Sequence, residues 1–250
     1  MLPINDKRIE EQSAFFQKRN EPNFAWGNAI SGILALPKLR AFWPMSSVDE
    51  NSDVYDISGQ GRVLTQVNTP VFGAYALRSY VLFNGTTQYL FRADEAGLDF
   101  ASSPLTIGIW FYPTNLTGVK DIVAKDDGVG QRQYALYTSG TTLCALVNGA
   151  ALNNIVSTNA ISLNAWNFML MRYTPSAELA VYLNGTWSRL AAGIIATIGA
   201  GTAQFRIGAN AAIAPLYHAG YASLCFPCAY AVEDVLVENV YQQTRALFGR

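Results

Sequence analysis

Apolar and polar side chains alternate along most of the chain after Ala41. The alternation is clearest at residues 105–112, 166–171 and 179–183, where large apolar residues recur at every second position. A period of two is typical of β-strands that bury one face more than the other. The pattern therefore predicts strands through the body of the chain.

Short turn sequences separate these predicted strands. Asn-Gly pairs, which tolerate the positive φ angles of tight hairpins, occur at residues 84–85, 148–149 and 184–185. Many short strands joined by such turns favour a β-sandwich over a sheet of alternating strands and helices.

The two ends of the chain depart from this pattern. After Glu233, apolar residues recur at helical spacing up to Phe248, which predicts a short C-terminal helix with two acidic residues in its first turn. Residues 1–38 predict a partly helical arm, with a helix from about Asn5 to Arg19 and then an apolar stretch that glycines interrupt. Because short helices are marginal without tertiary partners, we expect the arm either to pack on its own chain or to dock on a neighbour.

Composition and charge narrow the functional classes. The chain has 250 residues, of which 50% are hydrophobic and 14% charged, with a net charge of −1. This balance excludes a disordered chain and gives no electrostatic argument for a nucleic-acid partner. The most apolar stretch, residues 190–203, is too short to insert in a bilayer, and the charged N-terminus does not resemble a signal peptide. We therefore expect synthesis in a cytoplasm without membrane insertion.

The three cysteines are Cys144, Cys225 and Cys228. An odd, small number of thiols does not form a disulfide framework. The C-x-x-C spacing of Cys225 and Cys228 suits half of a redox or zinc site, but no second ligand pair accompanies it. The simpler interpretation is three buried thiols.

Several segments, in this order, resemble the laminin-G-like domains of the concanavalin A-like jelly-roll family. They are LRAFWPMSS with YDISGQG, VLFNGTTQYL, SPLTIGIWFYP, DIVAKDD, RQYALYTSG, LNAWNFMLMRY, AELAVYLNG and AGYASLCFPCAY. The resemblance covers about residues 39–248 and implies an all-β sandwich of two antiparallel sheets, which sets a domain at 39–250 after the arm at 1–38. It does not imply one function, because this fold carries lectins, glycosidases, receptor-binding modules and structural domains.

Catalytic chemistry finds little support. Glycosidases need two carboxylates that face one sugar, and those of this fold carry them as Glu-x-Asp-x-x-Glu on one strand. That string is absent, and Glu178 is the sole acid between Gly128 and Val232. The only histidine, His218, has no nucleophile elbow near it, so we interpret it as a loop or interface residue. The sequence predicts a protein that is not an enzyme.

Metal binding has one candidate position. Many laminin-G-like domains hold a calcium ion near the rim, and Asp49, Glu50, Asp53 and Asp56 lie close in the sequence. The preferred alternative is that Asp56 accepts hydrogen bonds from its own Ser-Gly turn. Asp53 and Asp56 therefore remain candidates for a structural calcium site, with no other cofactor expected.

Sugar binding would use exposed aromatic rings. Trp110 and Trp166 lie in strand patterns that predict core positions, whereas Trp187 follows a turn and is the candidate for an exposed ring.

The sequence leaves two hypotheses about function. The first is a structural protein of a virus or phage particle that assembles as a homo-oligomer through the arm and ends at the virion surface. The second is a carbohydrate-binding adhesion module.

Overall fold

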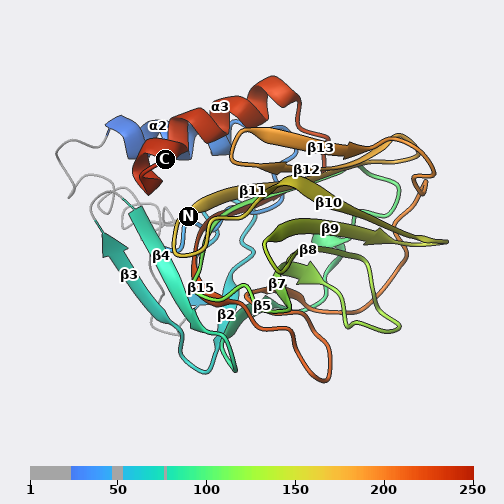
Figure 1. Ribbon diagram of the computed structural model, residues 1–250, viewed down its shortest axis with the longest axis horizontal. Helices are drawn as coiled ribbons and strands as arrows, with labels where there is room; N and C mark the ends of the chain where they lie inside the picture. The colour runs from blue at the N-terminus through green and yellow to red at the C-terminus, as the bar shows by residue number, and fades with distance from the viewer. Residues whose placement is uncertain (1–23, 47–52, 76–77) are drawn as a thin grey trace, which may run out of the picture.

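The computed structural model describes residues 24–46, 53–75 and 78–250. Two antiparallel sheets pack face to face, which confirms the predicted sandwich (Figure 1). The eight-stranded sheet has, in spatial order, β1 (Asp53–Val54), β2 (Leu64–Val67), β5 (Tyr89–Arg92), β14 (Phe205–Ile207), β7 (Val119–Lys125), β8 (Tyr134–Ser139), β9 (Thr142–Asn148) and β10 (Leu152–Ala160). The seven-stranded sheet has β13 (Thr186–Leu190), β12 (Glu178–Leu183), β11 (Asn167–Thr174), β6 (Leu105–Pro113), β15 (Ala219–Cys228), β4 (Arg78–Asn84) and β3 (Val71–Tyr75).

The main core lies between the two sheets. On β6, Ile107, Ile109 and Phe111 point into it, and Met169 and Met171 do so from the neighbouring β11. These are the positions that the alternating pattern identifies. Each large side chain that leaves water here contributes about 1.5–3 kcal/mol, so this layer supplies most of the driving force for folding.

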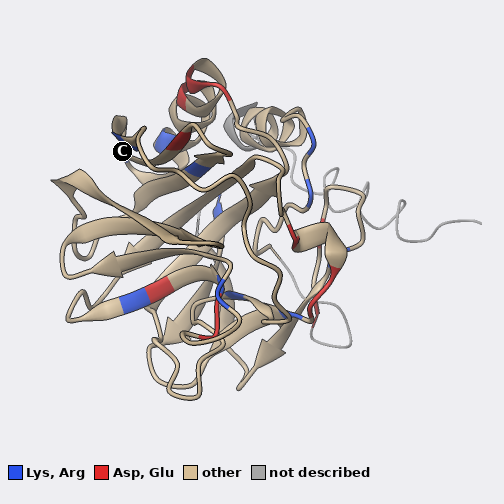
Figure 2. Cartoon of the chain, turned by 90° about the vertical axis from the view of Figure 1, so that its right-hand side faces the viewer, with Lys and Arg blue, Asp and Glu red and all other residues tan. Residues whose placement is uncertain are grey.

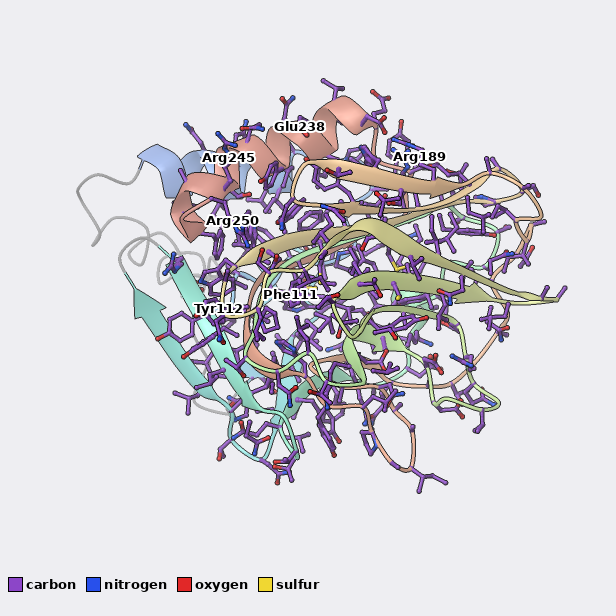
Figure 3. The ribbon with its side chains drawn as sticks, in the orientation of Figure 1. Phe111, Tyr112, Arg189, Glu238, Arg245 and Arg250 are labelled. Atoms are coloured by element: carbon purple, nitrogen blue, oxygen red, sulfur yellow. The ribbon has the colours of Figure 1, made fainter. Side chains whose placement is uncertain are left out.

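A second core covers the outer face of the seven-stranded sheet. It lies under α2 (Phe24–Leu34), α3 (Asp234–Arg245) and the 3₁₀ turn η2 (Ala246–Phe248). Trp110 is fully buried there, stacks on Phe248 with ring centroids 4.3 Å apart, and donates its Nε1–H to Thr244 Oγ1 at 2.9 Å. Figure 3 shows the change of side along β6, where Phe111 belongs to the main core and Tyr112 packs against the second. Strand β6 is thus buried on both faces, which differs from the one-sided burial that its pattern predicts.

The arm folds partly onto its own chain. Helix α2 packs beside α3 (Figure 1), and Ala29, Ile30 and Ile33 are buried in the second core. The helix predicted at residues 5–19 lies outside the described residues. The predicted C-terminal helix is confirmed as α3, with Glu233 as its N-cap.

The Asn-Gly pairs form two kinds of connection. Asn184 and Gly185 have φ angles of 49° and 98° and close the hairpin between β12 and β13. The pair at 148–149 joins β9 to β10. The pair at 84–85 instead leads from β4 in one sheet to β5 in the other. Within the described ranges, no helix is long and apolar enough to cross a membrane.

A candidate ligand-binding face

The calcium candidates have partners within the protein. Asp56 accepts the backbone N–H groups of Phe42 and Ser58 on Oδ1 and that of Arg62 on Oδ2, each at 2.9 Å. This is the arrangement of the turn interpretation. Asp53 Oδ1 accepts the hydroxyl of Thr65 at 3.0 Å. Residues 49 and 50 lie outside the described part of the chain, and within that part no three His, Cys, Asp or Glu side chains are grouped to hold a metal ion.

Trp187 lies on β13 and is only partly exposed. The guanidinium groups of Arg172 and Arg189 each lie 4.4 Å from the centre of its ring, and the ring of Tyr182 lies 5.1 Å away. Trp187 also lines a shallow groove of about 540 Å³ between β10 and β13. Because three side chains already hold the ring, little of its face is free to stack on a ligand.

The charges beside this groove cancel. Arg172 and Arg189 both pair with Glu178 and both pair with Asp234, at distances of 2.6–2.8 Å. Two cations and two anions thus form a closed ring that joins β11, β12 and β13 to the first turn of α3. We call these four side chains the ion ring.

The outer face of the eight-stranded sheet is different, because both described α-helices lie on the other sheet (Figure 1). Strand register aligns Asp53, Thr65, Phe91 and Arg206 in one row across β1, β2, β5 and β14. Their neighbours in the strands, such as Leu64, Leu90, Phe205 and Ile207, point into the main core. The row therefore faces outward.

Three partly exposed aromatic rings extend from this row. Tyr89 lies 6.3 Å from Phe91 and 6.3 Å from Tyr217, measured between ring centroids. Tyr89 and Phe91 are alternate residues of β5, and Tyr217 comes from the loop that precedes β15. We call Tyr89, Phe91 and Tyr217 the aromatic strip.

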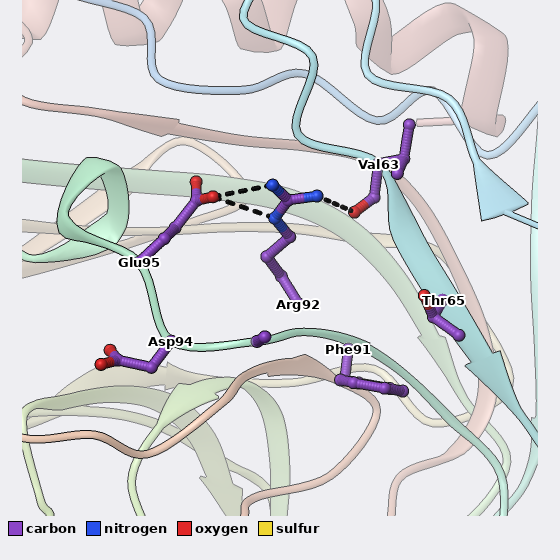
Figure 4. A pocket seen from close by; sticks show the side chains of 7 residues that line it. Val63, Thr65, Phe91, Arg92, Asp94 and Glu95 are labelled. Carbon is purple, nitrogen blue, oxygen red and sulfur yellow. Dashed lines mark hydrogen bonds and ion pairs between the residues drawn. The ribbon is translucent and has the colours of Figure 1, made fainter.

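A pocket of about 220 Å³ opens at the Phe91 end of the aromatic strip. Figure 4 shows its polar wall, where Arg92 donates from Nε and Nη2 to Glu95 Oε2 at 3.0 and 2.8 Å and from Nη1 to the Val63 carbonyl at 3.3 Å. Glu95 also pairs with Arg62. Lining the pocket as well are Thr65, Ala93 and Asp94.

Asp94 forms an ion pair with a buried lysine. Lys125 is fully buried, and its Nζ lies 2.5 Å from Asp94 Oδ1 and 2.8 Å from Asp99 Oδ1. Both acids of the pocket, Asp94 and Glu95, are therefore engaged in ion pairs. A glycosidase needs one carboxyl group that gives a proton and a second that attacks or activates water, and paired carboxylates suit this poorly.

The remaining candidate groups lie inside the fold. Cys144, Cys225 and Cys228 are free and buried, as predicted. His218 lies in the loop before β15, is buried beside Phe83 and Phe111, and has no hydrogen-bond partner for Nε2 among the described residues. Burial lowers the pKa of His218 to about 4, so the imidazole is neutral.

Charged residues are sparse over both sheets (Figure 2). Asp121, on β7, is one of the few, and it is 4% exposed. Burial, with repulsion from Asp126 as a second cause, raises the pKa of Asp121 to about 7.

Sequence and structure comparisons agree on the fold family. Residues 84–220 match the family model described as the concanavalin A-like lectin/glucanases superfamily, which is more than half of the chain. No curated protein matches the chain by sequence.

Among solved structures, the binding domain of Paraclostridial Mosquitocidal Protein 1 is similar, with a TM-score of 0.66, 12% identity and coverage of 84% of this chain and 52% of that one. A structure of botulinum neurotoxin type C, whose cell entry is dependent upon interaction with two ganglioside molecules, has a TM-score of 0.63, 8% identity and coverage of 85% and 52%. Domain 4 of the extracellular arabinanase AbnA from Geobacillus stearothermophilus, in complex with arabinotriose, has a TM-score of 0.64, 16% identity and coverage of 83% and 100%. The chain spans about half the length of the two toxin structures. At these identities, the likeness concerns the fold alone.

Proposed function

This chain belongs to the concanavalin A-like lectin/glucanases superfamily, and from that premise we propose that it is a carbohydrate-binding protein without catalytic activity. The proposed ligand site is the aromatic strip and the adjoining pocket on the outer face of the eight-stranded sheet. The arabinotriose bound to the AbnA domain and the gangliosides with which the botulinum toxin interacts support a glycan as the class of ligand.

The observation that carries the proposal is the aromatic strip itself. Three neighbouring, partly exposed rings lie beside a pocket that is large enough for one sugar residue. Binding sites for small molecules combine apolar and aromatic walls with a few polar groups that fix orientation. Thr65, Asp94 and Glu95 are such groups here, and the rings offer flat surfaces to the C–H groups of a sugar.

A glycan array followed by calorimetry tests this proposal. Tyr217→Ala removes one ring of the aromatic strip. Because Tyr217 lies in a loop, this substitution should not disturb the sheet. An aromatic contact contributes about 0.5–1.5 kcal/mol, so affinity for the best glycan is expected to fall about 2- to 12-fold. Trp187→Ala is the matched control at the competing groove, and affinity should not change. Loss of binding in the Trp187 variant alone would move the site to that groove.

A structural role in a virus or phage particle is a second proposal. The observation that favours it is the sequence of residues 133–171, which contains no Asp, Glu, Lys or Arg and includes β8, β9 and β10 at one end of the eight-stranded sheet and the start of β11 in the other sheet. Interface cores are depleted in charged residues. Light scattering at rising protein concentration tests for the homo-oligomer that this role requires, and a monomer at every concentration would argue against it.

A further inference from the structure

We infer that the proposed ligand is an acidic sugar, whose carboxylate binds the guanidinium group of Arg206. This inference rests on the proposed carbohydrate-binding function and specifies the class of glycan. Three observations support it: the position of Arg206 beside the aromatic strip, its neutral hydrogen-bond partners, and the ion pairs that five other arginines form.

Arg206 lies within the candidate site. It is the outward-facing residue of β14 and is paired in register with Phe91 on β5. Its guanidinium carbon lies 4.3 Å from the centre of the Tyr89 ring, so it contacts the aromatic strip directly. A ligand seated on Phe91 and Tyr217 would come within reach of this cation.

The partners of Arg206 are all neutral. Nε and Nη2 donate to Gln204 Oε1 at 3.0 and 2.9 Å, and Nη1 donates to the carbonyl of Asn210 at 2.7 Å. In the described part of the chain, no carboxylate forms an ion pair with Arg206. By contrast, Arg62, Arg92, Arg132, Arg172 and Arg189 each pair with at least one acid.

A partly buried cation without a counter-ion is energetically costly. Burial lowers the pKa of Arg206, although the group stays protonated at any physiological pH. An anion supplied by a ligand would recover the lost solvation of the charge. The two acids of the pocket do not oppose this, because Asp94 and Glu95 are neutralised by their own ion pairs.

The geometry of the guanidinium also suits a carboxylate. The group has five N–H donors, and the three hydrogen bonds to Gln204 and Asn210 leave two of them for a ligand. A carboxylate is a stronger acceptor than an amide oxygen and matches the planar fork of arginine. The groove beside Trp187 offers nothing comparable, because Arg189 is held within the ion ring.

Calorimetry with matched sugars tests the inference. The probes are trigalacturonate against galactotriose of the same linkage, and 3′-sialyllactose against lactose. We expect at least one acidic sugar to bind about 10- to 100-fold more tightly than its neutral counterpart, since a hydrogen-bonded ion pair contributes about this factor. The preference should weaken as salt concentration rises.

Variants assign the preference to one side chain. Arg206→Gln should remove the preference for the acidic sugar and leave the neutral affinity within about twofold. Arg206→Lys keeps the charge without the planar fork, so it should retain part of the preference. Arg245→Gln is the matched control, because Arg245 is exposed on α3 and its loss changes the net charge equally. Melting temperatures of all variants show whether each one is folded.

The outcomes separate the two proposals. Binding of neutral sugars alone, or an acid preference that persists in Arg206→Gln, overturns the inference about Arg206 and leaves carbohydrate binding intact. Absence of binding to all four sugars at millimolar concentration, together with a blank glycan array, overturns both.

Discussion

Replacing Ile33 by alanine tests whether helix α2 belongs to the folding unit. Ile33 is fully buried between α2 and the second core. The substitution deletes three buried carbon atoms, which at about 0.8 kcal/mol each amounts to about 2.4 kcal/mol, and the cavity that remains raises the cost towards about 4 kcal/mol. For a chain of this length, the melting temperature should fall by about 5–15 °C.

Leu34 provides a control one residue away. It lies on the same helix but is 41% exposed, so Leu34→Ala should change the free energy of unfolding by no more than about 0.5 kcal/mol. Thermal and urea unfolding, followed by circular dichroism, compare the two variants. Equal, small effects would refute the packing of α2 on its own chain. A concentration-dependent melting temperature, with a lower mass for Ile33→Ala by light scattering, would instead show that α2 docks on a neighbouring subunit.

Three further outcomes follow from buried polar groups. Trp110→Phe removes the hydrogen bond from Nε1 to Thr244 Oγ1, whereas the Thr244 hydroxyl still donates to the Val240 carbonyl, so urea unfolding should show a loss of about 0.5–1.5 kcal/mol. Lys125→Met leaves Asp94 and Asp99 without their cation, but water reaches both carboxylates, which are 34% and 36% exposed, so the loss should be about 1–2 kcal/mol, measured in the same way; an unchanged midpoint would contradict the ion pairs. The neutral state of His218, with a pKa near 4, stabilises the fold above about pH 6.5, and this contribution is lost as pH falls towards 4. Protonated Asp121, with a pKa near 7, stabilises the fold most below its ordinary pKa of 3.8, and this contribution is lost as pH rises to 7. Between pH 4 and 6.5 these two contributions to the free energy of unfolding change in opposite directions with pH, so they cancel in the parent protein. In Asp121→Asn only the His218 contribution remains, and the free energy of unfolding should fall by about 1.4 kcal/mol for each pH unit of acidification. Identical pH profiles of stability for the variant and the parent protein would contradict this.

The sandwich is largely predictable from the sequence because apolar and polar residues alternate along its strands. Residues 105–112 identify β6 and the side chains that enter the main core. The same pattern does not reveal that Trp110 and Tyr112 are covered as well, because burial on the second face depends on helices far away in the sequence. Period-two alternation distinguishes the two faces of a strand, but tertiary contacts decide how much of each face is exposed to solvent.

Helix α2 escaped prediction because of its glycines. Gly27 and Gly32 lower the helix propensity of residues 24–34, so the stretch resembles an interrupted apolar segment. In the fold, a Cβ at Gly32 would collide with the side chain of Gln243 on α3. The residue that weakens the local signal thus lies opposite α3, where the end of the flexible Gln243 side chain takes the place of the missing Cβ.

The candidate ligand-binding face was also missed, since its rings come from distant segments. Tyr89 and Phe91 meet Tyr217 only through the strand register of β5 and β14 and the return of the chain before β15. Sequence alone favours tryptophan as a sugar platform, and Trp187 is indeed partly exposed, but Arg172 and Arg189 hold its ring.

The helical layer also determines which sheet face stays open for the proposed ligand. Helices α2 and α3 occupy the outer face of the seven-stranded sheet, and the ion ring fastens the first turn of α3 to that sheet with its charges fully compensated. Within residues 24–46, 53–75 and 78–250, no helix covers the outer face of the eight-stranded sheet, and Arg206 on that face is left with neutral partners. If a counter-ion were needed only for folding, an acid at position 204 in place of glutamine would supply it. In Gln204→Glu, the new carboxylate should pair with Arg206, so the free protein should become more stable and the preference for acidic sugars should disappear. A variant that becomes more stable but keeps the preference would show that Arg206 does not bind the ligand.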